Sequence, residues 1–489
     1  PPRSADEQSS RRPSALPLGP LDVLGAPRPY LAAYRAAMTL TTAVAILAVD
    51  FSAFPRRLAK TDSTRGVGLM DVGSGSFVLA NALASRVARG LTTSSPSWWF
   101  AFWKRASVDV SSSNAHAGGG RDATNDATGA APPERAHTIA RTLRSTRWWS
   151  LIFLACARGL ATHAMDYQQP VGEYGRHWNF FATLAVVDLC ATATPLPPAF
   201  SSFAGLAILV AHQTSLLRGA SPSGAGAAGV ASSYGEYLLR DVPRGEGLLE
   251  QNKEGVGSIP GYVALYFLGA GLGRFVERSL CDAAKRASIR ATTRALREAT
   301  EEEEAAREAM IAACTAHEQR VATDAAETAR AKRDSALEVG AGLGGYQWAW
   351  RWLLSLAVAD AAFWAAAMTL HARCQAVSRR TANAAYCAWM LAFNLQVLLA
   401  FIAAGLLFPA TPPVPKLLAA VNRRLLPTFL VANLLTGAVN GAMDTIHVGT
   451  LTAWASMVGY LSVVCVVGLA LDTVLSPQSV RAHSGTKAD

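Results

Sequence analysis

The stretch AAYCAWMLAFNLQVLLAFIAAGLLFP, residues 384–409, contains no Asp, Glu, Lys or Arg. A helix that crosses a bilayer needs about 20 consecutive, mostly apolar residues, so this stretch is long enough to span one. Residues 445–471 form a second run without any of these four charged residues. The two runs predict a membrane protein rather than a soluble one.

Further apolar runs follow one another along most of the chain. The fold class predicted from them is all-α: a polytopic membrane protein, a helical bundle of about 9–13 transmembrane helices. We expect spans near residues 30–51, 68–87, 148–165, 177–194, 199–217, 261–275, 352–370, 384–408, 425–443 and 450–475.

The charge of the chain fits a membrane protein as well. Only 16% of the residues are charged and 51% are hydrophobic, whereas a typical soluble domain has roughly 25% charged residues. The net charge is +10, but the basic residues cluster at the ends of apolar runs, as Arg56, Arg57 and Lys60 do, and as Arg379 and Arg380 do. This placement indicates topology signals and contact with anionic headgroups, and it argues against nucleic acid as a partner.

The remaining segments have different compositions. Residues 1–28 are rich in Pro, Ser and Arg and predict a disordered tail, with no recognisable signal peptide. Within a membrane domain over residues 29–475, we expect a low-complexity loop at 107–136 and a charged helical or disordered segment at 282–338. Residues 476–489 form a C-terminal tail. The seven cysteines show no C-x-x-C spacing, so neither a metal site nor a disulfide framework is predicted.

One group of ionisable residues lies between two apolar runs, in MDYQQPVGEYGRHWNFF, residues 165–181. A proline and two glycines oppose helix there, so Asp166 and His177 should emerge at the same membrane face. Burying a charge costs several kcal/mol, and ionisable groups at such a boundary commonly line a polar site. The alternative is structural: Asp166 caps its helix or pairs with Arg176, and His177 is an interfacial residue.

A second group lies in ANLLTGAVNGAMD, residues 432–444. Asn433, Asn440 and Asp444 stand at i, i+7 and i+11, so we expect them on one face of a helix. They can serve either a substrate or helix–helix contact, and contacts of the second kind contribute about 1 kcal/mol each.

A third group lies in RRTANAAYCAWMLAFN, residues 379–394. Arg379, Asn383, Tyr386 and Asn394 are predicted to share a helical face. The arginine pair at its start can bind a phosphate through two hydrogen bonds, or snorkel to ordinary lipid phosphates.

Two motifs of soluble enzymes have little support. DVGSGSF, residues 71–77, lacks the Lys-Ser/Thr ending of a phosphate-binding loop and has no strand before it, so its small residues indicate helix packing. A G-x-S-x-G elbow of serine hydrolases is not found in the sequence.

Taken together, several blocks resemble a known family. They are PRPYLAAYRA, AVDFSAFPRRLAKT, GLMDVGSGSF, DYQQPVGEYGRHWNFF, QNKEGVGSIPGY, RRTANAAYCAW and NLLTGAVNGAMDT, in this order from residue 27 to about residue 445. The set is similar to the inositol acyltransferases of GPI-anchor biosynthesis, which include the fungal GPI-anchored wall transfer protein and its animal counterpart PIG-W. The resemblance does not cover the segments at 107–136 and 282–338.

The resemblance implies a reaction and a place. The reaction is transfer of a fatty acyl chain, typically palmitoyl, from acyl-CoA to the inositol 2-hydroxyl of glucosaminyl-phosphatidylinositol. It implies a multi-pass protein of the endoplasmic reticulum membrane, whose partners are the two substrates and the lipid bilayer. Acyl-CoA would be a co-substrate, with no permanently bound cofactor and no metal.

The candidate residues suit this chemistry. Asp166, whose pKa burial would raise, is our first candidate for the base, His177 is the rival, and Arg176 can stabilise the oxyanion or hold a phosphate. We expect Asn433, Asn440 and Asp444 to orient the inositol hydroxyls, and Arg379 and Lys253 to meet phosphates. The other candidate substrate-binding residues are Arg380, Asn383, Glu173, Tyr174 and Asn179.

Other functions remain possible on the sequence alone. A lipid or solute transporter also places ionisable residues in spans, although no internal repeat is visible in the sequence. A scaffold subunit would need polar residues only for helix contact, and a membrane acyltransferase of the intramembrane-histidine type would depend on His177 alone. An acyl-enzyme on Cys190 is disfavoured, because this thiol lies in an apolar run.

Overall fold

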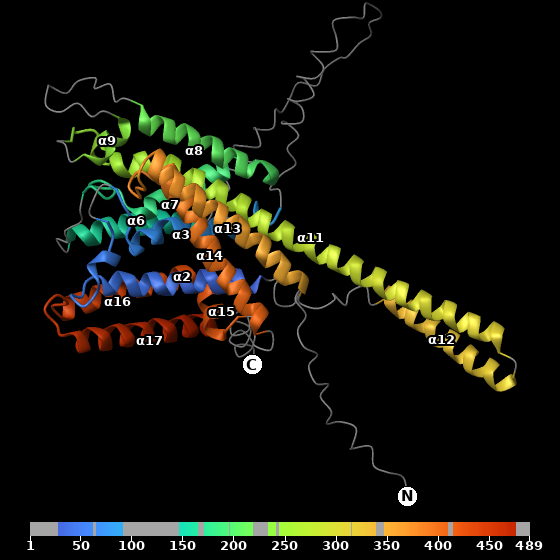
Figure 1. Cartoon of the computed structure of the whole chain (residues 1–489). Coiled ribbons are helices and arrows are strands. Elements are labelled where there is room, and N and C mark those ends of the chain that lie inside the picture. The colour runs from blue at the N-terminus through green and yellow to red at the C-terminus, as the bar shows by residue number, and fades with distance from the viewer. Residues whose placement is uncertain are drawn as a thin grey trace, which may run out of the picture. The chain divides into compact units, whose positions relative to one another are not determined.

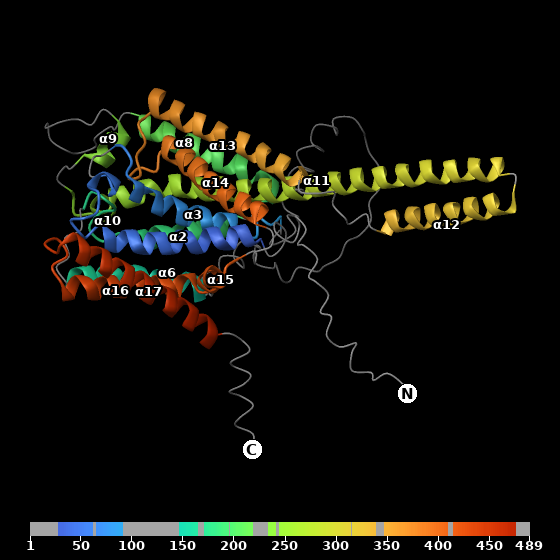
Figure 2. The same ribbon diagram turned by 60° about the horizontal axis from the view of Figure 1, so that its bottom comes forward.

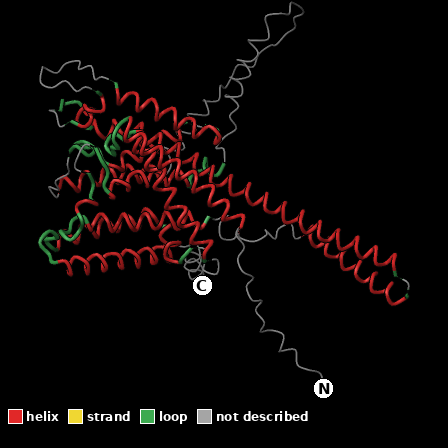
Figure 3. The backbone as a smooth tube through the Cα atoms, viewed as in Figure 1, coloured by secondary structure: helices red, strands yellow, loops and turns green. Residues whose placement is uncertain are grey.

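The computed structural model describes residues 28–61, 65–90, 146–164, 171–194, 196–218, 233–240, 244–313, 315–338, 347–408 and 414–475. Within these ranges every regular element is a helix (Figure 3). Seven of the helices are long and apolar enough to cross a membrane, and three apolar helices are shorter. The predicted all-α, polytopic membrane fold is confirmed.

Among the described residues, seven of the ten predicted spans lie in candidate membrane spans, and the other three, at 68–87, 148–165 and 177–194, lie in the shorter apolar helices. The run at 261–275 is not a short span of its own but part of α11, a helix of 60 residues. The seven candidate spans are α2 (Pro29–Ala48), Pro198–Leu217 (the turn η4, Pro198–Phe200, with α8, Ser201–Leu217), α11 (Lys253–Ala312), α13 (Gln347–Arg373), α14 (Ala384–Leu407), α16 (Leu425–Ala442) and α17 (Thr450–Val474).

The chain divides into two compact units. Unit 1 comprises Pro1–Phe54, Val276–Ala361 and Leu395–Asp489, and unit 2 comprises Pro55–Phe275 and Ala362–Asn394. Each unit is described by itself.

In unit 1, α2 packs against α15 (Lys416–Arg423), α16 and α17 (Figure 1). Small and aliphatic residues of these four helices form the core, among them Ala36, Leu47, Val421 and Ala453. The Tyr460 hydroxyl is a polar group inside this core: it lies 3.0 Å from the carbonyl oxygen of Ala432 and 3.2 Å from that of Ala43. The hydroxyl thus connects α17 to both neighbours, and a buried polar group needs such partners.

The charged segment at 282–338 is helical in the described residues. The C-terminal part of α11 and α12 (Ala316–Glu338) run back along each other as a hairpin (Figures 1 and 2). Buried alanines face the seam, including Ala299, Ala306, Ala322 and Ala329. Because alanine has a small side chain and a high helix propensity, this seam needs no large apolar stripe.

Unit 2 contains the shorter elements that position the candidate site. Its loops are joined by backbone hydrogen bonds. In one of them the N–H of Gly66 donates to the carbonyl oxygen of Val377 at 2.8 Å. Its remaining elements are η2 (Arg56–Leu58), η3 (Leu69–Asp71), α3 (Val72–Leu83), α6 (Thr146–Ala164), α7 (Phe180–Ala193), α9 (Tyr234–Leu239) and α10 (Leu248–Gln251).

Candidate functional site

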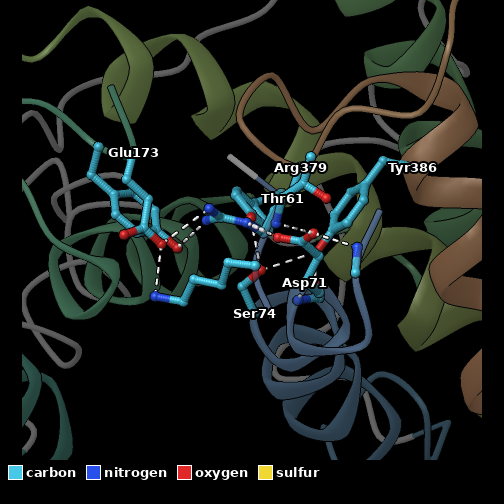
Figure 4. A network of polar contacts seen from close by, with 11 residues as sticks. Thr61, Asp71, Ser74, Glu173, Arg379 and Tyr386 are labelled. Carbon is cyan, nitrogen blue, oxygen red and sulfur yellow. Dashed lines mark hydrogen bonds and ion pairs between the residues drawn. The ribbon is translucent and has the colours of Figure 1, made fainter. Parts of the chain in front are cut away.

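A buried ionic network lies at the start of α3 in unit 2 (Figure 4). Nε of Arg379 lies 2.7 Å from Oδ1 of Asp71, and Nη2 lies 3.0 Å from Oε1 of Glu173. The same Glu173 oxygen lies 2.9 Å from Nζ of Lys60. Nη1 of Arg379 donates to the Tyr174 hydroxyl at 3.1 Å. The side chains of Arg379 and Asp71 are 6% and 1% exposed, so this pair is almost fully removed from solvent.

Asp71 connects the network to the loop before α3. Its Oδ2 accepts the backbone N–H groups of Thr61, at 3.0 Å, and Gly68, at 2.8 Å. One carboxylate therefore receives a guanidinium N–H and two backbone N–H groups. Charge-assisted bonds of this kind compensate the cost of burying a charge.

Tyrosine hydroxyls form the next layer of the network (Figure 4). The Tyr386 hydroxyl donates to the Asp71 carbonyl oxygen at 3.1 Å and accepts the Gly75 N–H at 3.1 Å. It also lies 3.0 Å from Oγ of Ser74, to which the Tyr262 hydroxyl donates at 3.1 Å. These bonds fix the first turn of α3 to the first turn of α14 and to α11 at Tyr262.

Glu173 gives the network a pH dependence. Burial raises the pKa of its carboxyl, but the nearby charges of Arg379 and Lys60 outweigh burial and hold the pKa below its ordinary value. A lowered folded-state pKa stabilises the fold above the unfolded-state pKa of about 4.3, and the gain is lost as the pH falls through the folded-state pKa.

Glu173→Gln is therefore expected to make the stability of the protein depend less on pH in the acid range. Between about pH 6 and pH 3 the melting temperature of the variant in detergent should fall less than that of the wild type. Glu301→Gln is the matched control, because Glu301 is 60% exposed in its pair with Arg297 and such a pair contributes little. An equal fall for Glu173→Gln and wild type would contradict the prediction.

The loop from 171 to 179, which carries two of the three catalytic candidates, is held against the start of α11. Oδ1 of Asn252 accepts the N–H groups of His177, at 2.8 Å, and Trp178, at 3.0 Å. The N–H of Arg176 donates to the carbonyl oxygen of Gln251 at 3.1 Å. The side chains of Arg176 and His177 are exposed, and Nε2 of His177 lies 3.1 Å from Oε1 of Gln251. The loop backbone is thus fixed while these two side chains face outward.

Asp166, our first candidate for the base, lies outside the described residues. It follows the last residue of α6, Ala164, by two positions in the chain. Its role stays a prediction.

Gly175 makes the close approach of this loop possible. Its φ is +112°, which disfavours any residue with a Cβ, and an added Cβ would lie 2.5 Å from Cα of Asn252. We expect Gly175→Ala to destabilise the protein by about 1–3 kcal/mol, measured by thermal unfolding in detergent. Gly437→Ala is the control, because a Cβ at Gly437 meets no atom within 4 Å and should leave stability unchanged or raise it by up to about 1 kcal/mol. Equal effects would contradict this account.

The helix predicted to carry Arg379 begins later than the spacing suggested. Arg379 lies in a turn and α14 starts five residues after it, so Arg379, Asn383, Tyr386 and Asn394 do not share one helical face. The physical reason is Asn383, whose Oδ1 accepts the N–H groups of Ser378, at 3.2 Å, and Tyr386, at 3.0 Å. Asn383 therefore caps α14 and closes the preceding turn. This cap holds Arg379 in the turn.

Three other predicted substrate-binding residues, Lys253, Asn179 and Arg380, also lie in unit 2. Nζ of Lys253 donates to the carbonyl oxygens of Tyr237, at 2.8 Å, and Arg240, at 2.7 Å, and is 4.8 Å above the Tyr237 ring. Asn179 caps α7, accepting two N–H groups of its first turn at 3.1 and 3.2 Å. Arg380 is half-buried in the turn before α14. The contacts of Lys253 and Asn179 are structural ones within the chain.

The asparagine group lies in unit 1. Nδ2 of Asn433 donates within its own helix, and Nδ2 of Asn440 donates to Oδ2 of Asp50 at 2.7 Å. Asp444 was predicted on the same helical face, but α16 ends at Ala442 and Asp444 lies in the exposed turn beyond it. There its Oδ2 lies 2.7 Å from Nδ1 of His447. Met443 has extended backbone (φ −146°, ψ 150°), so the helical face stops before Asp444, and α17 begins at Thr450.

The sequence did not identify Asp71 as a site residue. Its motif, DVGSGSF, was interpreted as helix packing, and Val72–Leu83 is indeed a helix with small buried residues. The available signal was an acid at the start of an apolar run, where a charge needs a partner. That partner, Arg379, stands 308 positions away, so no local spacing indicates the pair.

Comparisons with known proteins agree with the blocks found in the sequence. A family model described as GWT1 matches residues 2–116 and 121–471. An Arabidopsis thaliana protein described as uncharacterized is 31% identical over 436 residues, which are 88% of this chain and 71% of that protein. GPI-anchored wall transfer protein 1 of Aspergillus fumigatus is 30% identical over 466 residues, 91% of this chain and 72% of that protein. The protein of the same name from Gibberella zeae is 29% identical over 489 residues, 96% and 76% of the two chains. The family match covers nearly the whole chain, and we conclude that this multi-pass membrane protein belongs to the GWT1 family.

Proposed function

We propose that the protein is a membrane O-acyltransferase of GPI-anchor biosynthesis. It transfers a fatty acyl chain, palmitoyl, from acyl-CoA to the inositol 2-hydroxyl of glucosaminyl-phosphatidylinositol in the endoplasmic reticulum membrane. Membership of the GWT1 family supports the pathway, since relatives named GPI-anchored wall transfer protein 1 match about nine-tenths of the chain.

The observation that carries the proposal is the fixed loop from 171 to 179. A buried ionic network holds Glu173 on one side, and Asn252 holds the backbone of His177 and Trp178 on the other. Arg176, between them, has an exposed side chain. A loop whose backbone is fixed while ionisable side chains face outward is suited to preorganised acid–base chemistry, because little reorganisation is needed during the reaction.

In the proposed step, the base, Asp166 or His177, removes the proton of the inositol 2-hydroxyl. The hydroxyl oxygen attacks the thioester carbonyl carbon, and Arg176 stabilises the negative charge on the tetrahedral intermediate. The carbon–sulfur bond then breaks, the ester remains on inositol, and the CoA thiolate leaves and takes up a proton. Transfer is direct within a complex of protein, donor and acceptor, without an acyl-enzyme.

The decisive experiment uses the purified protein with palmitoyl-CoA and glucosaminyl-phosphatidylinositol. The expected product is an acylated lipid that resists phosphatidylinositol-specific phospholipase C, because that enzyme requires a free inositol 2-hydroxyl. Free CoA should appear in equal amount. A transporter or a scaffold subunit would release no CoA, so folded protein without either product would refute the proposal.

A further inference from the structure

A polar cavity of about 290 Å³ lies in unit 2, separate from the buried network. Segments from four places in the chain form it: the loop before η3, the end of α8, the start of α9 and the end of α13 with the residues after it. The residues that matter for its chemistry are Arg65, Ser233, Glu236, His371, Arg373 and Gln375. Among its described lining residues Leu217 is the only large apolar one, so the lining does not suit an acyl chain.

The charges in the cavity favour an anion. Two of the lining residues, Arg65 and Arg373, are positively charged, and Glu236, the one acidic residue among the described lining residues, lies 3.9 Å from Arg240 on its own helix. His371 adds a donor. Its Nδ1 accepts the backbone N–H of Val377 at 3.2 Å, which leaves Nε2 to carry the proton of the neutral ring. Two guanidinium groups and an N–H donor are the groups that bind phosphate oxygens.

The cavity is joined to the buried network through a short backbone bridge. Gly66, which follows Arg65, donates its N–H to Val377 O at 2.8 Å and pairs with Ser378, the residue before Arg379. The cavity residue Gln375 adds side-chain contacts. Its Oε1 accepts from Nδ2 of Asn383, the α14 cap, at 3.3 Å, and from Gln213 on α8 at 3.1 Å. A ligand in the cavity would therefore lie beside the turn that carries Arg379.

We propose that this cavity binds a phosphate group of a substrate. In the proposed reaction both substrates carry phosphates: the nucleotide part of acyl-CoA, and the phosphodiester of the inositol lipid. The identification of these two sources rests on the proposed function, whereas the affinity for phosphate rests on the cavity alone. The cavity binds the charged end of a substrate, and other residues position the reacting carbonyl or hydroxyl.

The test measures binding of three probes to the purified protein by calorimetry: free CoA, adenosine 3′,5′-bisphosphate, and phosphatidylinositol in mixed micelles. The variant is Arg373→Gln. Its side chain is exposed, so folding should be unaffected, and an unchanged melting temperature checks this. The matched control is Arg294→Gln, an exposed arginine on the charged part of α11. We expect at least one phosphate probe to bind about tenfold more weakly to Arg373→Gln and unchanged to the control.

The pattern among the probes identifies the source of the phosphate. Weaker binding of CoA and of the bisphosphate assigns the cavity to the donor, and the KM for palmitoyl-CoA should then rise with kcat unchanged. Weaker binding of phosphatidylinositol alone assigns it to the lipid. If Arg373→Gln and wild type bind all three probes alike, the inference is overturned even if wild type transfers acyl groups. If Arg373→Gln weakens binding but the wild type makes no acylated lipid, the cavity stands and the proposed function fails.

Discussion

Replacing Arg379 by glutamine is expected to destabilise the protein by about 3–5 kcal/mol, the cost found when one partner of a buried ion pair is removed. Arg379 contacts two carboxylates, Asp71 at 2.7 Å and Glu173 at 3.0 Å, and the Tyr174 hydroxyl at 3.1 Å. Burial lowers the pKa of the guanidinium, but these neighbours raise it well above its ordinary value, so it stays charged. Glutamine has the length to replace one hydrogen bond but not the charge.

The large effect arises because the buried carboxylate of Asp71 loses its cationic partner. Its side chain is 1% exposed, so without Arg379 its charge is buried and only the N–H groups of Thr61 and Gly68 remain as partners. The combined variant Asp71→Asn with Arg379→Gln removes both charges and should recover much of the lost stability. Such recovery distinguishes a buried charge from simple loss of packing.

Thermal unfolding in detergent measures both variants. Arg423→Gln is the control, because it breaks an Arg–Asp pair with the same chemical change on the surface of unit 1. Arg423 is 57% exposed in its pair with Asp472, and exposed pairs contribute about 0–1 kcal/mol. If Arg379→Gln is no more destabilising than Arg423→Gln, the buried network does not hold these segments together.

The membrane fold was predictable because it depends on composition over about 20 residues at a time. The run at 384–408 and the helix Ala384–Leu407 agree almost to the residue. The length of α11 was not predictable in the same way: hydropathy identifies only residues 261–275, whereas the helix continues into a charged segment to Ala312. Helix propensity and the alanine seam with α12 sustain it there, and neither appears in a search for apolar runs.

The candidate site was predictable only in part, for a different reason. Glu173 and Tyr174 were chosen from one motif and Arg379 from another, and the structure brings them into contact in one network. Asp71 was missed and Asp444 was misplaced. Pairing at a distance of 308 residues and the end of a helix at Ala442 depend on tertiary contacts, which no periodicity encodes.

Asp166→Ala is expected to have the largest effect on activity, a loss of acyl transfer of about 10²–10⁴-fold, the usual contribution of a general base. In the sequence, Asp166 follows the last residue of α6 by two positions and precedes the loop from 171 to 179. Asn252 and the buried network hold the backbone of that loop in place. The folded fraction should not change, because the proposed role is in the reaction. The measurement is initial rates of CoA release with palmitoyl-CoA and glucosaminyl-phosphatidylinositol.

His177→Ala separates the two candidates for the base. The ring of His177 is exposed and lies near the Gln251 amide, so its loss removes one surface contact and leaves the Asn252 bonds to the backbone intact. If Asp166 is the base, His177→Ala should keep most of its activity. The reverse pattern, an active Asp166→Ala and an inactive His177→Ala, would make the imidazole the base and leave the acyltransferase proposal standing.

Asp282→Ala, which changes an exposed carboxylate on α11, controls for loss of charge alone. Two fully active variants would mean that neither residue takes the proton, because direct transfer from a hydroxyl cannot proceed at an undiminished rate once its base is gone.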